Sequence, residues 1–162
     1  IDLRDENAPL DEWSGDAGCA VQYFSQQGVA RLARVAGIQF PDEMKPAERL
    51  VEVQQLMDAN DPRAQAIYET IGVYFGYAVA HWAELYDFQH LLVLGRVTSG
   101  PGGAIILEKA REVLRVEFPE LFARITLQMP DETEKRHGQA VAAASLPALK
   151  AGSNAPLQAK AA

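Results

Sequence analysis

The sequence predicts an α/β protein that is rich in helix and has a small sheet. Three consecutive elements between Asp61 and Pro119 predict it: a long apolar helix, the short aliphatic strand HLLVLG, and a glycine-rich turn that opens a second helix. In proteins with this order of elements, ligands bind in a crevice at the carboxyl end of a strand. We therefore expect any binding site near the glycine-rich turn.

The long helix is predicted to begin at Pro62, because proline suits the first helical position and Asp61 can cap the helix. Its apolar residues recur at helical spacing and cover more than one face. Gly72, Gly76 and Ala80 form a ridge of small residues that lets another backbone come close, which leaves homodimerisation open. No uninterrupted apolar run approaches the roughly 18 residues of a membrane span, so we expect a core helix and no membrane partner.

The strand is predicted over Leu91 to Leu94, with His90 before it, and a short aliphatic run of this kind suits a strand covered on both faces. Four glycines in the following turn permit positive φ or a close backbone approach. Free N–H groups at the start of the next helix, near Gly103, can face a phosphate or an adenosine. A tight connection without a ligand is the alternative, because the spacing is not that of a phosphate-binding loop.

The remaining elements follow from helical spacing, caps and turn residues. We expect a helix from about Ala20 to Ala36 ended by Gly37, and another that starts near Pro46. Later come a strand over 124–129, a last helix that begins after Asp131 and runs through 145, and a disordered tail over 148–162. Residues 1–147 are thus predicted to form one domain.

Composition narrows the functional classes. The net charge of −7 provides no basic surface, so nucleic acid is not an expected partner of this segment. The single cysteine excludes an internal disulfide and fits a reducing cytoplasm, and no signal peptide precedes the first elements. Because the chain starts at Ile1 with residues typical of the end of a strand, we expect it to be the back portion of a longer protein.

Three segments resemble the ROK family of bacterial sugar kinases and sugar-responsive repressors: GDAGCAVQYFSQQGVARLARVAG, HLLVLGRVTSGPGGAIILEKA and GQAVAAASL. The resemblance implies that residues 1–147 are the C-terminal lobe of an actin-like (ribonuclease H-like) ATPase. It implies an adenosine-binding motif that uses Gly95, Arg96, Thr98, Ser99, Gly100, Gly102 and Gly103. It also implies ATP with Mg as the cofactor of the full-length protein, a sugar as a further ligand, and a homodimer. The family's catalytic aspartate belongs to the other lobe, so this chain has no catalytic residue assigned.

The departures from the family pattern CxCGxxGCxE are specific. Gly15, Gly18 and Cys19 match, but Glu12 and Ser14 stand where two zinc-binding cysteines are implied, so we expect no zinc and no other metal. Val21 stands where the family has a sugar-contacting glutamate. The chain is therefore expected to be either the nucleotide half-site lobe of a sugar kinase, inactive by itself, or a non-catalytic sensing or dimerisation lobe of a regulator.

Other polar residues have ordinary structural explanations. We expect Cys19 to be a small buried hydrophobe and His81 and His90 to be hydrogen-bonded structural residues, while His137 lies on a solvated helix start. Acidic residues around position 12 suit a surface loop that bonds its own backbone. Trp13 and Pro9 are expected to pack that loop down. Arg96 can meet a phosphate or a base, or pair with a neighbouring acid.

Overall fold

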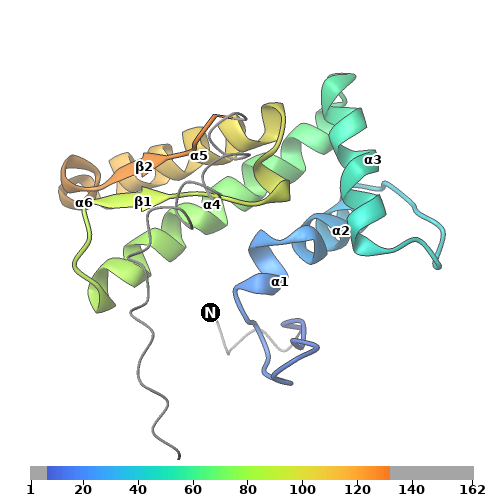
Figure 1. Ribbon diagram of the computed structural model, residues 1–162, viewed down its shortest axis with the longest axis horizontal. Helices are drawn as coiled ribbons and strands as arrows, with labels where there is room; N and C mark the ends of the chain where they lie inside the picture. Colours follow the sequence, from blue (N-terminus) through green and yellow to red (C-terminus); the bar gives the residue numbers. More distant parts are fainter. Residues whose placement is uncertain (1–6, 132–162) are drawn as a thin grey trace, which may run out of the picture. The chain divides into compact units, whose positions relative to one another are not determined.

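The computed structural model describes residues 7–131 (Figure 1). Its elements, in chain order, are α1 (Val21–Phe24), α2 (Gln26–Val35), α3 (Pro46–Asp58), α4 (Pro62–Leu85), β1 (His90–Leu92), the 3₁₀ turn η1 (Arg96–Thr98), α5 (Pro101–Glu117), α6 (Pro119–Arg124) and β2 (Thr126–Gln128). These elements all belong to one compact unit, which ends at Met129. The expected helix-rich α/β class with a small sheet is confirmed.

The two strands pair in parallel, with His90 opposite Thr126 and Leu92 opposite Gln128. A parallel pair needs a crossover connection, and α5 with α6 supplies it. One face of the pair packs on the core through the buried Leu127 and the half-buried Leu91. The other face is open among the described residues, where Leu92 is 56% exposed, so the expectation of a strand covered on both faces was wrong.

Helices α4 and α5 lie side by side and form the centre of the fold (Figure 1). Their contact is close because glycines of α4 face the backbone of α5. A Cβ built on Gly72 would lie 2.8 Å from the Ile106 carbonyl oxygen, and one on Gly76 would lie 3.0 Å from the Ala110 carbonyl oxygen. The predicted ridge is thus occupied by a helix of the same chain, and a homodimer, which stays a prediction, would have to use another surface.

The core extends from this contact to α2 and α3, which cover the first half of α4. Their inward side chains include Val29, Ala33, Leu50 and Val53, each at most 2% exposed. Aromatic rings close the side near α1, where Phe24, Phe75 and Trp82 meet edge to face with centroids about 6 Å apart. Such edge-to-face pairs add to the stabilisation that burial provides.

Several element boundaries differ from the prediction. The helix expected from Ala20 to Ala36 is broken at Ser25, whose extended backbone ends α1 and whose hydroxyl oxygen accepts a hydrogen bond from Gln27 N to cap α2. Helix α5 begins at Pro101, so the last two glycines of the turn lie in its first turn. Burial of α4 is also less complete than expected, since Tyr77 and Leu85 are exposed. The predicted last helix and tail lie outside the described residues.

Within the described part of the chain, no helix is long and apolar enough to cross a membrane. The start of α4 is as predicted: Pro62 opens it, and the Asp61 carboxylate accepts a hydrogen bond from Arg63 N at 2.8 Å. The same carboxylate pairs with the Arg63 guanidinium at 2.6 Å. Through these hydrogen bonds, Arg63 lowers the pKa of Asp61 to about 2.

We expect Gly72→Ala to destabilise the protein by about 1 to 3 kcal/mol, because the added methyl group would force α4 and α5 apart. This loss exceeds the gain of about 1 kcal/mol in helix propensity. Urea denaturation measures the difference. Val73→Ala, at an exposed position beside it, is the control and should change stability by less than about 0.5 kcal/mol. An unchanged stability in Gly72→Ala would contradict the close helix contact.

We expect the Asp61 cap to make stability depend on pH in the acid range. A carboxyl group whose pKa is lower in the folded state stabilises the fold above its unfolded pKa, near 3.8, and this stabilisation is lost as the pH falls towards about 2. Asp61→Asn keeps a good N-cap but cannot titrate. Its free energy of unfolding should therefore fall less steeply between pH 4 and 2 than that of the unaltered chain. Equal slopes in the two proteins would refute this assignment.

Candidate functional site

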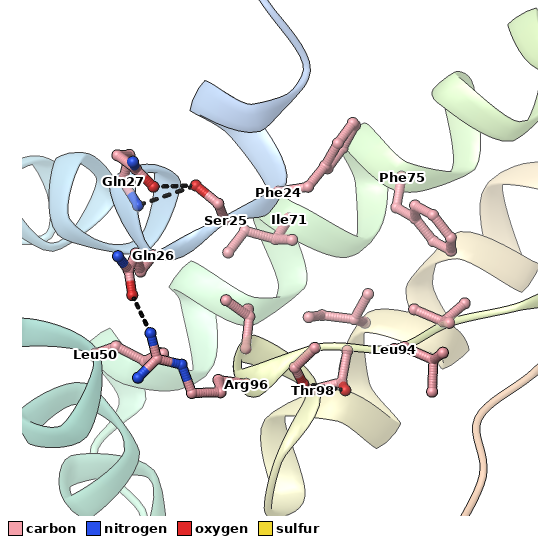
Figure 2. A pocket seen from close by; sticks show the side chains of 14 residues that line it. Phe24, Ser25, Gln26, Gln27, Leu50, Ile71, Phe75, Leu94, Arg96 and Thr98 are labelled. Atoms are coloured by element: carbon pink, nitrogen blue, oxygen red, sulfur yellow. Dashed lines mark hydrogen bonds between the residues drawn. The ribbon is translucent and has the colours of Figure 1, made fainter. Parts of the chain in front are cut away.

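A cavity of about 320 Å³ opens at the carboxyl end of β1, between η1 and the start of α2 (Figure 2). We call it the α2 cavity, and it is lined by Phe24, Ser25, Gln26, Gln27, Leu50, Ile71, Phe75, Val93, Leu94, Gly95, Arg96, Val97, Thr98 and Ile106. This is the place where an α/β fold binds ligands and where the sequence predicted a site. Its volume lies at the lower end of the range for small-molecule sites, about 300 to 1,000 Å³.

The polar groups of the α2 cavity come from two elements that approach from opposite sides (Figure 2). From η1, the Arg96 guanidinium donates to the Gln26 amide oxygen at 3.2 Å, so it contacts an amide and not the acid considered from sequence. From α2, Ser25 and Gln27 add a hydroxyl and an amide. The lining contains one cation and no carboxylate, and apolar side chains form the rest.

Hydrogen bonds within the turn and from α3 fix its backbone. Gly95 has a φ of 132°, which only glycine adopts readily, and its carbonyl oxygen accepts a hydrogen bond from the Thr98 hydroxyl at 2.7 Å. On the other side, the Gln54 amide of α3 donates to the Arg96 carbonyl oxygen at 2.9 Å. These bonds fix the backbone of Arg96 while its side chain stays exposed at the rim of the cavity.

A second cavity, of about 200 Å³, lies beyond the turn, between the end of α3 and the start of α5. We call it the α3 cavity, and it is lined by Gln54, Met57, Asp58, Tyr68, Ser99, Gly100, Pro101 and Gly102. Gly100 has a φ of 70° and offers no side chain to cap α5. The start of α5 thus lines the α3 cavity and not the α2 cavity.

The seven predicted binding residues are therefore divided. Gly95, Arg96 and Thr98 line the α2 cavity, whereas Ser99, Gly100 and Gly102 line the α3 cavity. Gly103 lines neither, because it packs against the Thr98 carbonyl group and the Met129 sulfur, where a Cβ would clash. Packing also explains why residue 102 is a glycine, since a Cβ there would overlap the Tyr68 ring.

Sequence reasoning missed the walls of the α2 cavity that come from the end of α1, the start of α2 and α4, namely Phe24, Ser25, Gln26, Ile71 and Phe75. The sequence did not indicate these residues, because a continuous helix was expected through Ser25. The only feature that could have indicated a break there was Ser25 followed three residues later by Gly28. Gly28 lies so near α1 that a Cβ would be 2.6 Å from the Tyr23 carbonyl oxygen, and this close approach accompanies the break between the helices.

The loop before α1 bonds its own backbone, as expected. The Asp11 carboxylate accepts hydrogen bonds from Ser14 N at 2.9 Å and Trp13 N at 3.2 Å, and these bonds lower its pKa. Trp13 is 95% exposed, so the expectation that it packs the loop down was wrong. The Ser14 hydroxyl lies 3.7 Å from the sulfur of the half-buried Cys19. The loop thus brings together positions 14 and 19, two of the three that the family pattern assigns to zinc-binding cysteines.

The histidines within residues 7–131 take no part in either cavity. His81 is exposed, with its Nδ1 3.9 Å from a Glu84 carboxylate oxygen, and His90 is exposed on the open face of the sheet. Neither is therefore buried in the core. Among the described residues, no group of three or more His, Cys, Asp or Glu side chains could hold a metal ion. His137 lies outside the described residues.

No protein-family model, no curated protein and no solved structure matches this chain. The functional argument therefore depends on the geometry of the two cavities and on the residues that line them.

We expect the protein to carry no structural zinc, because Cys19 is the only thiol and zinc sites of this kind need several soft ligands. Elemental analysis of protein purified without a chelator or a metal-affinity tag should give far less than one zinc per chain. Near-stoichiometric zinc in the unaltered chain would contradict the assignment of Glu12 and Ser14 to the positions of two zinc-binding cysteines.

Proposed function

We propose that this chain is the C-terminal lobe of a cytoplasmic ROK-type protein with the actin-like fold, and that its α2 cavity binds the adenine base of ATP. The observation that carries the proposal is the place of this cavity. It opens on Gly95 to Thr98, directly after β1, where the resemblance put an adenosine-binding turn. The order of strand, glycine-containing turn and helix found there is also the order that the resemblance implies.

The composition of the α2 cavity suits a planar, neutral base. Phe24, Phe75 and Leu94 offer apolar and aromatic surface for the faces of a ring, and aromatic rings stack in offset or edge-on geometry. The edge of a purine carries both donors and acceptors, which the amides of Gln26 and Gln27 can satisfy. Arg96 adds a cation at the rim, where the ribose and phosphates of a nucleotide would leave the cavity.

Magnesium does not fit the residues of the α2 cavity. Mg²⁺ requires oxygen ligands that usually include carboxylates, and no carboxylate lines this cavity. Phosphoryl transfer needs the metal, a phosphate cradle and a base together. We therefore propose that this lobe binds the base of the nucleotide, that the metal and the phosphates are held by the other lobe of a full-length kinase, and that the chain alone transfers no phosphoryl group.

A non-catalytic sensing or dimerisation lobe of a regulator is the second candidate, because Val21 counts against sugar phosphorylation by the first. This residue is 43% exposed at the start of α1, where the family pattern has a sugar-contacting glutamate. A valine side chain cannot accept a hydrogen bond from a sugar hydroxyl, and the loss of such a contact typically costs about 1 to 3 kcal/mol. The sequence before Ile1 separates the two candidates: Asp-x-Gly-x-Thr favours a kinase, and a helix-turn-helix favours a regulator.

Adenosine titrated into the chain should shift the amide resonances of Gly95 and Thr98, with a dissociation constant of about 1 mM, as befits half of a site. Arg96→Ala should weaken binding about tenfold, which corresponds to about 1.4 kcal/mol, because the variant loses the guanidinium that contacts Gln26 at the rim of the cavity. Arg115→Ala, which removes an exposed arginine far along α5, is the matched control and should leave binding unchanged. Absence of shifts at Gly95 and Thr98 would overturn the proposal.

A further inference from the structure

The Gln26 side chain at the start of α2 has an amide group whose orientation is fixed by its partner (Figure 2). Its oxygen accepts a hydrogen bond from the Arg96 guanidinium at 3.2 Å. A guanidinium has N–H donors and no acceptor, so the amide oxygen must face it. Within residues 7–131, the Gln26 amide nitrogen makes no hydrogen bond of its own. Its two N–H groups are therefore available to a ligand.

The position of Arg96 is fixed in turn by bonds to its backbone. The Gln54 amide nitrogen of α3 donates to the Arg96 carbonyl oxygen at 2.9 Å, and Ser99 N donates to the same oxygen at 3.2 Å. Gln54, Arg96 and Gln26 thus form a chain of contacts that runs from α3 across the turn to α2. The orientation of the Gln26 amide follows from this chain.

The other neutral polar side chains that line the α2 cavity already have partners within the protein. The Thr98 hydroxyl donates to the Gly95 carbonyl oxygen. The Ser25 hydroxyl oxygen accepts from Gln27 N at 3.2 Å and also contacts the Gln27 amide oxygen. Because a hydroxyl both donates and accepts, this contact does not fix which way the Gln27 amide points. Gln26 is thus the amide of the lining whose free donors the structure identifies.

We propose that Gln26 selects the base bound in the α2 cavity by donating an amide N–H to one of its ring nitrogens. This inference rests on the proposed binding of adenine there, and it names the group that recognises the base. Adenine in a nucleoside offers ring nitrogens at positions 1, 3 and 7 that accept hydrogen bonds. No carboxylate lines the cavity to compete for the amide, and Phe24 and Phe75 provide surface for the ring faces. Arg96 acts as a positioning residue for Gln26.

The Gln26→Glu variant tests the donor. It keeps an oxygen for Arg96 but cannot donate at neutral pH, and a glutamate in the first turn of a helix is favourable, so it should melt no lower than the unaltered chain. It should bind adenosine about tenfold more weakly, as measured from the amide resonances of Gly95 and Thr98. Gln55→Glu, at an exposed position of α3, adds the same charge and should bind as the unaltered chain does.

Deaza analogues of adenosine, in which a C–H group replaces the nitrogen at position 1, 3 or 7, identify the acceptor. One analogue should bind the unaltered chain about tenfold more weakly than adenosine does, because it lacks the nitrogen that Gln26 contacts. In Gln26→Ala, that analogue and adenosine should bind equally, since no contact is left to lose. A purely structural role of Gln26 would not depend on a single ring nitrogen.

The two proposals fail in different ways. Absence of shifts at Gly95 and Thr98 when adenosine is added to the unaltered chain overturns both of them. If adenosine binds, equal binding by Gln26→Glu overturns the role of Gln26 alone. Equal binding of adenosine and all the deaza analogues to the unaltered chain also overturns that role and leaves adenine binding in place.

Discussion

The close contact between α4 and α5 is the constraint on which the rest of the structure depends. Without side chains at Gly72 and Gly76, the two helix backbones approach until the carbonyl oxygens of α5 lie against α4. Helix α5 is also part of the crossover between the two parallel strands, so its position fixes where β1 ends and where β2 returns. The turn after β1 is thereby held against α5 and α2, and the two cavities form on its two sides.

The turn from Gly95 to Gly100 separates two environments of different chemistry. On the side of α2, aromatic and aliphatic side chains surround a few amides and one guanidinium, and no carboxylate is present. On the side of α3, a carboxylate, two hydroxyls and a helix start surround a smaller space. The amide of Gln54 links the two sides, because it lines the α3 cavity and holds the backbone of Arg96.

Backbone conformation and packing explain the four glycines of the turn. Gly95 and Gly100 have positive φ values that the bend requires. No side chain fits at positions 102 and 103, because Tyr68 and Thr98 occupy the space beside these glycines. A glycine-rich turn at a strand end is therefore explained by backbone conformation and packing, and the argument for binding rests on the cavities.

The sequence by itself determined the features that depend on local chemistry. Helical spacing with Asp61 and Pro62 predicted α4, and Gly37 predicted the end of α2, because caps and periodicity act within a few residues. The site was predicted only as a stretch, Gly95 to Gly103. Tertiary structure alone decided that this stretch divides between two cavities, and that the helix predicted from Ala20 to Ala36 breaks at Ser25. It also decided that one face of the sheet is open among residues 7–131. These features result from contacts between residues far apart in the chain, such as Gln54 with Arg96, which no local pattern encodes.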